Sequence, residues 1–66
     1  MQVTVNGEQV ELTDGATVAD VVAARAGGHD RVAVARNGDV VPRSTWAQTA
    51  LAPGDAVEVL APTAGG

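Results

Sequence analysis

The sequence predicts a small α+β fold in which one main helix lies across one face of a mixed sheet of about five strands. Three observations predict it. The segments 2–12 and 31–41 each alternate apolar and polar residues around an Asn-Gly pair, the pattern of a two-residue hairpin. The segment 17–26 between them has the apolar spacing of a helix. A last alternating segment, 56–60, leads into a tail, 61–66, that ends in two glycines.

Length and composition are those of one small domain near the lower size limit for unaided folding. Most apolar residues are Val and Ala, which predicts a core of small, strand-favouring side chains. The net charge of −4 and the pI of about 4.5 argue against nucleic-acid binding. No signal peptide appears, and no apolar run approaches the ~20 residues that span a bilayer. We therefore expect a cytoplasmic protein with no nucleic-acid or membrane partner.

The first hairpin is expected to pair Val5 with Glu8 and Val3 with Val10 across the turn at Asn6. This register places one set of side chains toward the core: Met1, Val3, Val5, Val10 and Leu12. The opposite face is wholly polar and must face water: Gln2, Thr4, Gln9 and Glu11.

The helix is expected to begin with Thr17 as its N-cap, and Asp20 completes a weaker form of the capping box. Its apolar stripe consists of Val18, Val21 and Val22. Gly27 and Gly28 offer a left-handed C-cap position, which predicts a helix of about two and a half turns.

The second hairpin, Arg31 to Val41, turns at Asn37 and Gly38. The expected pairs are Arg36 with Asp39, Ala35 with Val40 and Val34 with Val41, and we expect Arg36 and Asp39 to interact across the strands. The side chains expected to point toward the core are Val32, Val34 and Val41.

A short turn of helix is expected after Pro42, which ends the strand, with Ser44 as its cap and Thr45, Trp46 and Ala47 inside it. Pro53, Gly54 and Asp55 then form a turn before the last strand.

The last strand is expected to point Val57 and Val59 inward and Glu58 and Leu60 outward. In the fold that this order of elements predicts, the last strand lies beside the strand that opens the second hairpin. Four small or apolar side chains would then share an exposed patch, which we interpret as a partner-docking site: Ala33, Ala35, Val40 and Leu60. Scattered exposed apolar residues without a role remain the alternative.

The tail is the main candidate for chemistry. Gly65 and Gly66 end the chain with an unhindered carboxylate on a bare backbone, which suits insertion into a narrow active site of another protein. We divide the chain into a domain, 1–60, and a flexible tail, 61–66. The chain has no Cys and no Lys, so no side chain offers a thiolate, a cysteine metal site or an amine for an isopeptide bond. We expect no metal site.

Other candidate residues favour structural roles. His29 has no nearby nucleophile or second ligand, so a solvated loop residue is the better interpretation. Trp46, the sole aromatic residue, is expected to seal one end of the sheet rather than to stack on a cofactor. Arg25, Arg36 and Arg43 are expected to be surface charges.

Several segments together resemble the ThiS family of sulfur carrier proteins, and they cover nearly the whole chain. They are VNGE (5–8), DGATVADVV (14–22), VAVARNGDVVPRS (32–44), LAPGDAVEVL (51–60) and the final Gly65 and Gly66. The resemblance implies the ubiquitin-like β-grasp fold and a carrier of sulfur for thiazole formation in thiamine biosynthesis.

In that family, an E1-like adenylyltransferase (ThiF type) uses ATP to adenylate the terminal carboxylate, and a desulfurase system supplies sulfur to make a thiocarboxylate. The resemblance therefore implies that Gly66 is the attachment site, that Gly65 is recognised in the tail, and that a thiazole synthase (ThiG type) accepts the sulfur. It also implies a carrier that acts as a co-substrate, binds no cofactor and is not itself an enzyme.

Three alternatives stay open. The chain could carry sulfur for another pathway, such as molybdopterin, cysteine or a secondary metabolite. It could be a ubiquitin-like protein modifier, because the absence of Lys forbids chains of itself but permits single attachment to other proteins. It could also be an interaction module with an inert tail.

Overall fold

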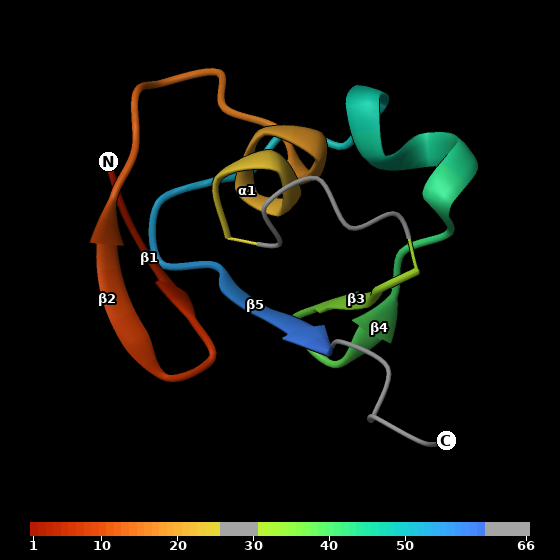
Figure 1. Ribbon diagram of the computed structural model, residues 1–66. Coiled ribbons are helices and arrows are strands. Elements are labelled where there is room, and N and C mark those ends of the chain that lie inside the picture. The colour runs from red at the N-terminus through yellow and green to blue at the C-terminus, as the bar shows by residue number, and fades with distance from the viewer. Residues whose placement is uncertain (26–30, 61–66) are drawn as a thin grey trace.

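The fold is a mixed sheet covered on one face by a helix, as seen in a computed structural model that describes residues 1–25 and 31–60 (Figure 1). In chain order the elements are β1 (Gln2–Val5), β2 (Glu8–Glu11), α1 (Val18–Arg25), β3 (Ala33–Arg36), β4 (Asp39–Val40), the 3-10 helix η1 (Arg43–Gln48) and β5 (Ala56–Leu60). The five strands lie in the order β2-β1-β5-β3-β4. The α+β fold predicted from the sequence is confirmed.

The first hairpin has the predicted register, with Val3 opposite Val10 and Val5 opposite Glu8. At its turn φ is 53° at Asn6 and 82° at Gly7, the left-handed region that a type I′ turn needs at both central positions. Val3 and Val5 are buried, whereas the side chains of the polar face are exposed or, at one position, half-buried: Gln2, Thr4, Gln9 and Glu11.

Helix α1 begins with the predicted capping box. The Thr17 N–H donates to the Asp20 carboxylate at 2.9 Å, and the Asp20 N–H donates to the Thr17 hydroxyl at 3.3 Å. The predicted apolar stripe is buried: Val18, Val21 and Val22. Gly27 and Gly28, expected to stop the helix, lie outside the described residues.

The second hairpin also has the predicted pairing, with Ala35 opposite Val40 and Arg36 opposite Asp39. Both of its strands are shorter than the alternating segment, since β3 starts at Ala33 and β4 is two residues long. The residues expected to face the core are buried: Val32, Val34 and Val41.

The short helix differs from the prediction. It is the 3-10 helix η1, which begins at Arg43, so Ser44 lies inside it and is not its cap. Pro42 precedes the first helical residue with a φ of −61°, and no side chain caps this end. The fixed φ of proline suits the position just before a helix, which favours the start at Arg43 over a start capped by Ser44.

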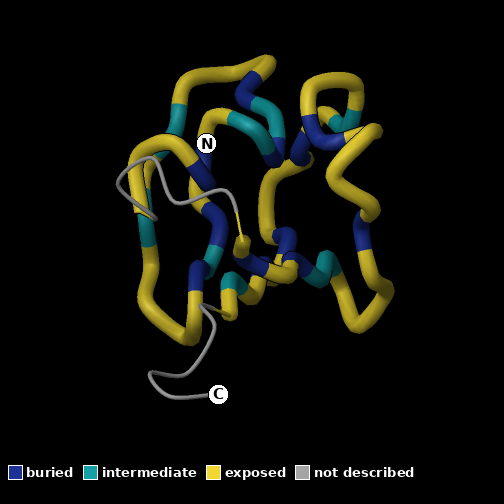
Figure 2. The backbone as a smooth tube through the Cα atoms, turned by 45° about the vertical axis from the view of Figure 1, so that its right-hand side comes forward, coloured by how far each residue is buried: buried dark blue, intermediate teal, exposed yellow. Residues whose placement is uncertain are grey.

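The core lies between the sheet and the two helices. The buried parts of the strands and of α1 face one another, whereas the hairpin turns are exposed (Figure 2). Trp46 belongs to this core, and its indole N–H donates to the Val41 carbonyl at 2.9 Å. The remainder of the core is almost entirely valine, as the composition predicts.

Strand β5 occupies the centre of the sheet. It runs parallel to β1, with Val57 opposite Val5, and antiparallel to β3, with Val59 opposite Val34. Val57 is buried and Leu60 is exposed, in the predicted alternation. The strand that leads to the tail is therefore held by neighbours on both sides.

Candidate functional site

The central strand presents the start of the predicted tail. β5 ends at Leu60, which is also the last described residue, so Gly65 and Gly66 lie outside the part of the chain that the structure describes. What the structure does define is the place where the chain leaves the sheet and the groups around it.

The four residues predicted to form a patch lie on three adjacent strands. Ala33 is opposite Leu60 across β3 and β5, and Ala35 is opposite Val40 across β3 and β4. Val40 is 79% exposed and Leu60 is 62% exposed, and these are the exposed large hydrophobic residues of the described chain. Ala33 is exposed and Ala35 is half-buried. We call these four residues the apolar patch; it borders the position from which the tail departs.

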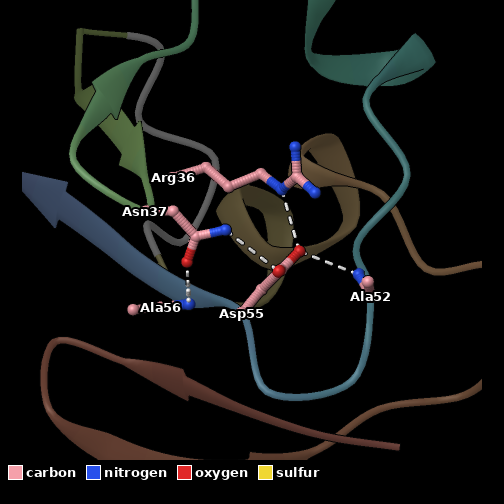
Figure 3. Close-up of polar contacts among 5 residues, drawn as sticks. All are labelled: Arg36, Asn37, Ala52, Asp55 and Ala56. Atoms are coloured by element: carbon pink, nitrogen blue, oxygen red, sulfur yellow. Dashed lines mark hydrogen bonds and ion pairs between the residues drawn. The ribbon is translucent and has the colours of Figure 1, made fainter.

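A buried carboxylate anchors the other end of β5 (Figure 3). Asp55 is 7% exposed and accepts hydrogen bonds from the Arg36 Nε at 2.8 Å, the Asn37 Nδ2 at 3.0 Å and the Ala52 N–H at 2.8 Å. The Asn37 Oδ1 in turn accepts the Ala56 N–H at 2.9 Å. This Asp55 cluster joins the second hairpin to the turn before β5.

The pKa of Asp55 is lowered by this cluster. Burial by itself disfavours the charged form and would raise the pKa. The hydrogen bonds from Ala52, Arg36 and Asn37, together with the positive charge of Arg36, favour the carboxylate and outweigh the burial. The group is therefore a stable anion and not a candidate for proton transfer near neutral pH.

A second asparagine holds the tail end of β5. The Asn6 N–H donates to the Val57 carbonyl at 2.9 Å, which is the last backbone contact from this side of the sheet. The Asn6 side chain also binds the backbone of Val59: its Oδ1 accepts the Val59 N–H at 2.8 Å, and its Nδ2 donates to the Val59 carbonyl at 3.2 Å.

The remaining sequence candidates have structural roles where they are described. Arg36 does not pair with Asp39 as expected, because its guanidinium lies against Asp55. Arg25 forms an ion pair with Glu8, and the Arg43 guanidinium lies 5.7 Å from the centre of the Trp46 ring. His29 lies outside the described residues.

Residues 1–25 and 31–60 contain neither a metal-binding cluster nor a helix that could span a membrane. No three His, Asp or Glu side chains there come together to hold a metal ion. None of the helices in these ranges has the length and hydrophobicity needed to cross a membrane.

Sequence reasoning missed three residues whose side chains hold β5. It interpreted Asn6 and Asn37 as turn formers, and Asp55 as a turn residue. The available signal was that both turns use asparagine rather than glycine at their first central position. Glycine would satisfy the backbone equally well, so a repeated asparagine suggests that the side chain is used.

Known proteins of one family are similar to this chain over nearly its whole length. The model of the ThiS family matches residues 3–66. The crystal structure of the thiamine biosynthesis protein (ThiS) from Geobacter metallireducens is similar over 100% of both chains, with a TM-score of 0.82 and 32% sequence identity. The predicted β-grasp fold is confirmed by this similarity.

A thiazole synthase from Paramagnetospirillum magneticum is 35% identical over 66 residues, which is all of this chain. The chain spans only 20% of the length of that relative. Because the family model includes nearly every residue, the chain belongs to the ThiS family.

Proposed function

We propose that this chain is a sulfur carrier whose Gly66 carboxylate is adenylated and then converted to a thiocarboxylate, for thiazole formation in thiamine biosynthesis. The observation that supports it best is that the family match extends to residue 66 and so includes the two terminal glycines. In this proposal residues 1–60 form the domain that partners recognise, and residues 61–66 form the tail that enters their active sites.

The chemistry needs an activated carboxyl group. A carboxylate is a resonance-stabilised anion and a poor electrophile, so its oxygen cannot be replaced directly. Its attack on the α-phosphate of ATP releases pyrophosphate and forms an acyl adenylate. The terminal sulfur of a persulfide, which a desulfurase system makes from cysteine, then attacks the carbonyl carbon, and AMP leaves. A thiol reduces the resulting acyl disulfide, which releases the thiocarboxylate and leaves a disulfide.

The chain contributes the reacting carboxylate and its position, while the E1-like adenylyltransferase contributes catalysis and uses ATP. Gly65 leaves the backbone next to the reacting group bare, so that the partner can enclose it closely. The chain is thus a co-substrate and not an enzyme, and it needs no cofactor of its own.

The sulfur acceptor in this proposal is a thiazole synthase. The similarity to one-fifth of the length of the Paramagnetospirillum thiazole synthase supports it. In that organism a segment similar to this chain is part of the same polypeptide as a thiazole synthase. This suits the present chain to deliver sulfur to a separate enzyme of that kind.

We propose the apolar patch as the docking site for these partners. Its two large members, Val40 and Leu60, are exposed next to the start of the tail, so a partner that covers the patch also receives the tail. Replacing both with Ser should raise the Kd for the adenylyltransferase about tenfold, because two buried apolar contacts would be lost.

A matched control replaces Gln2 and Gln9 with Ser on the polar half of the same sheet, where both side chains are exposed. Titration of both double variants against the adenylyltransferase by calorimetry measures the effect. An unchanged Kd for the Val40→Ser, Leu60→Ser variant would remove the docking proposal and leave the carrier chemistry intact.

The reacting end is tested by substitution of the two glycines. Gly66→Ala and Gly65→Ala should each lower the rate of ATP-dependent pyrophosphate release by about a hundredfold, because a methyl group displaces the carboxylate in a closely fitted channel. The unfolding curves of both variants should match that of the wild type.

Thr13→Ala is the control, because Thr13 is an exposed loop residue of the domain. Full activity of both glycine variants would argue for a tail that no enzyme encloses, as expected of an inert interaction module.

A further inference from the structure

The side chain of Asn6 extends the sheet beyond the end of β1. β1 ends at Val5, and the chain turns away at Asn6 into the hairpin. Alternate backbone groups of β5 face β1, namely those of Val57 and Val59. The first of these has a backbone partner in the Asn6 N–H, but the turn leaves no backbone to pair with Val59.

The Asn6 carboxamide supplies the missing partner. A carboxamide has the same donor and acceptor as a peptide group. Its Oδ1 and Nδ2 contact the N–H and the carbonyl of Val59 at 2.8 and 3.2 Å, and so pair both groups that a longer β1 would have paired. The two residues are 53 positions apart in the chain, so this contact joins the first turn to the last strand.

We propose that Asn6 is a positioning residue for the reaction of the tail: it holds Val59 so that the chain leaves the sheet at a fixed point. This inference rests on the proposed function. Val59 is followed by Leu60 of the apolar patch and then directly by residues 61–66. Asn6 therefore fixes the point at which residues 61–66 begin relative to the docking surface.

The point at which the chain leaves the sheet determines how far residues 61–66 can reach. Six residues span at most about 20 Å when fully extended. Without the Asn6 carboxamide, the last two residues of β5 are held by β3 alone. Each opening of that remaining pairing lengthens the tether by about 7 Å, which lowers the effective concentration of its end at a given place. It also moves Leu60 away from Ala33 in the patch.

The position of Asn6 makes a local effect separable from a loss of folding. Asn6 is exposed, so without it the polar groups of Val59 would be hydrated rather than left unpaired in the core. Asn6→Gly keeps the turn, because glycine adopts the positive φ of this position readily. The variant removes the carboxamide, and the added backbone freedom of glycine is shared by the control below.

Asn37→Gly is the matched control. Asn37 also has a positive φ at the first position of an Asn-Gly turn, and its side chain also contacts β5, but at Ala56 and Asp55. These contacts are at the end of β5 that is far from the tail. Asn6→Asp is a graded variant, because an aspartate can accept the Val59 N–H but has no donor for the Val59 carbonyl.

The test combines amide hydrogen exchange with adenylation kinetics at a temperature where every variant is folded. In Asn6→Gly the Val59 amide should exchange about tenfold faster, since one hydrogen bond protects it. With the adenylyltransferase and ATP, kcat for pyrophosphate release should fall about tenfold with KM nearly unchanged. Asn6→Asp should be intermediate, and Asn37→Gly should keep the kcat of the wild type.

Three contrary results would distinguish failure of the positioning role from failure of the carrier function. If the wild-type chain reacts and Asn6→Gly has the same kcat, the positioning role of Asn6 is wrong while the carrier function stands. If Asn37→Gly loses as much kcat as Asn6→Gly, the effect is one of general stability and the role is again wrong. If the wild-type chain releases no pyrophosphate, the proposed function fails and this inference fails with it.

Discussion

At the scale of single residues, Asp55 does more for the fold than its place in a turn suggests. Its carboxylate accepts hydrogen bonds from one arginine, one asparagine and one backbone N–H. A buried carboxylate requires such partners, whereas an exposed one is satisfied by water. This explains why Arg36 pairs with Asp55 and not with the exposed Asp39 opposite it, which the sequence pattern had favoured.

The lowered pKa of Asp55 predicts a dependence of stability on pH. The unfolded chain has the higher pKa, about 3.9, and so binds the proton more tightly than the folded one. The contribution of Asp55 is therefore complete above about pH 5 and is lost as the pH falls through the folded pKa. Asp55→Asn should lower the free energy of unfolding by roughly 2 kcal/mol at neutral pH.

Urea unfolding between neutral pH and about pH 3 measures this effect. The gap between Asp55→Asn and the wild type should narrow as the solution becomes acidic. Asp39→Asn serves as the control, because Asp39 is exposed and its loss should cost less than about 0.5 kcal/mol. A gap for Asp55→Asn that stays constant down to acidic pH would contradict the assigned role.

At the scale of elements, local signals in the sequence predicted what local physics determines. Both Asn-Gly turns fix the register of their hairpins, and the Thr17 and Asp20 pair fixes the start of α1. The prediction was wrong where two local signals competed. Ser44 is a good cap, but η1 begins at Arg43, directly after Pro42.

The capping box of α1 gives a prediction at this scale. Thr17→Ala removes the hydroxyl that accepts the Asp20 N–H, and should lower the free energy of unfolding by about 1 kcal/mol. Thr13→Ala, in the preceding loop, should change it by less than about 0.5 kcal/mol. Thermal or urea unfolding of the two variants compares them directly, and equal stability would show that the cap contributes nothing.

At the scale of the whole molecule, the order of the strands decides which residues meet. Alternation and turn residues predict individual strands, but the parallel pairing of β1 with β5 joins segments from opposite ends of the chain. That pairing brings Asn6 to Val59, and the antiparallel pairing of β3 with β5 brings the second hairpin to Asp55. Hydrophobic patterning has no information about such polar contacts, and so they could not be predicted from it.

The exposed apolar patch was easier to predict. The side-chain period of two places Val40 and Leu60 on the outer face once the register is known, and the turn at Asn37 and Gly38 determines that register. The fold and the patch thus follow from sequence patterns, whereas the groups that hold β5 in place required the structure.

Gly66 is the group proposed to accept sulfur. The most direct test is intact mass spectrometry of the chain after incubation with the adenylyltransferase, ATP, a cysteine desulfurase, cysteine and a thiol reductant, with fragmentation to locate the change. The mass is expected to rise by the difference between one sulfur and one oxygen atom, at Gly66, and only when ATP is present. An unchanged mass under these conditions, or covalent joining of the chain to other proteins, would contradict this proposal.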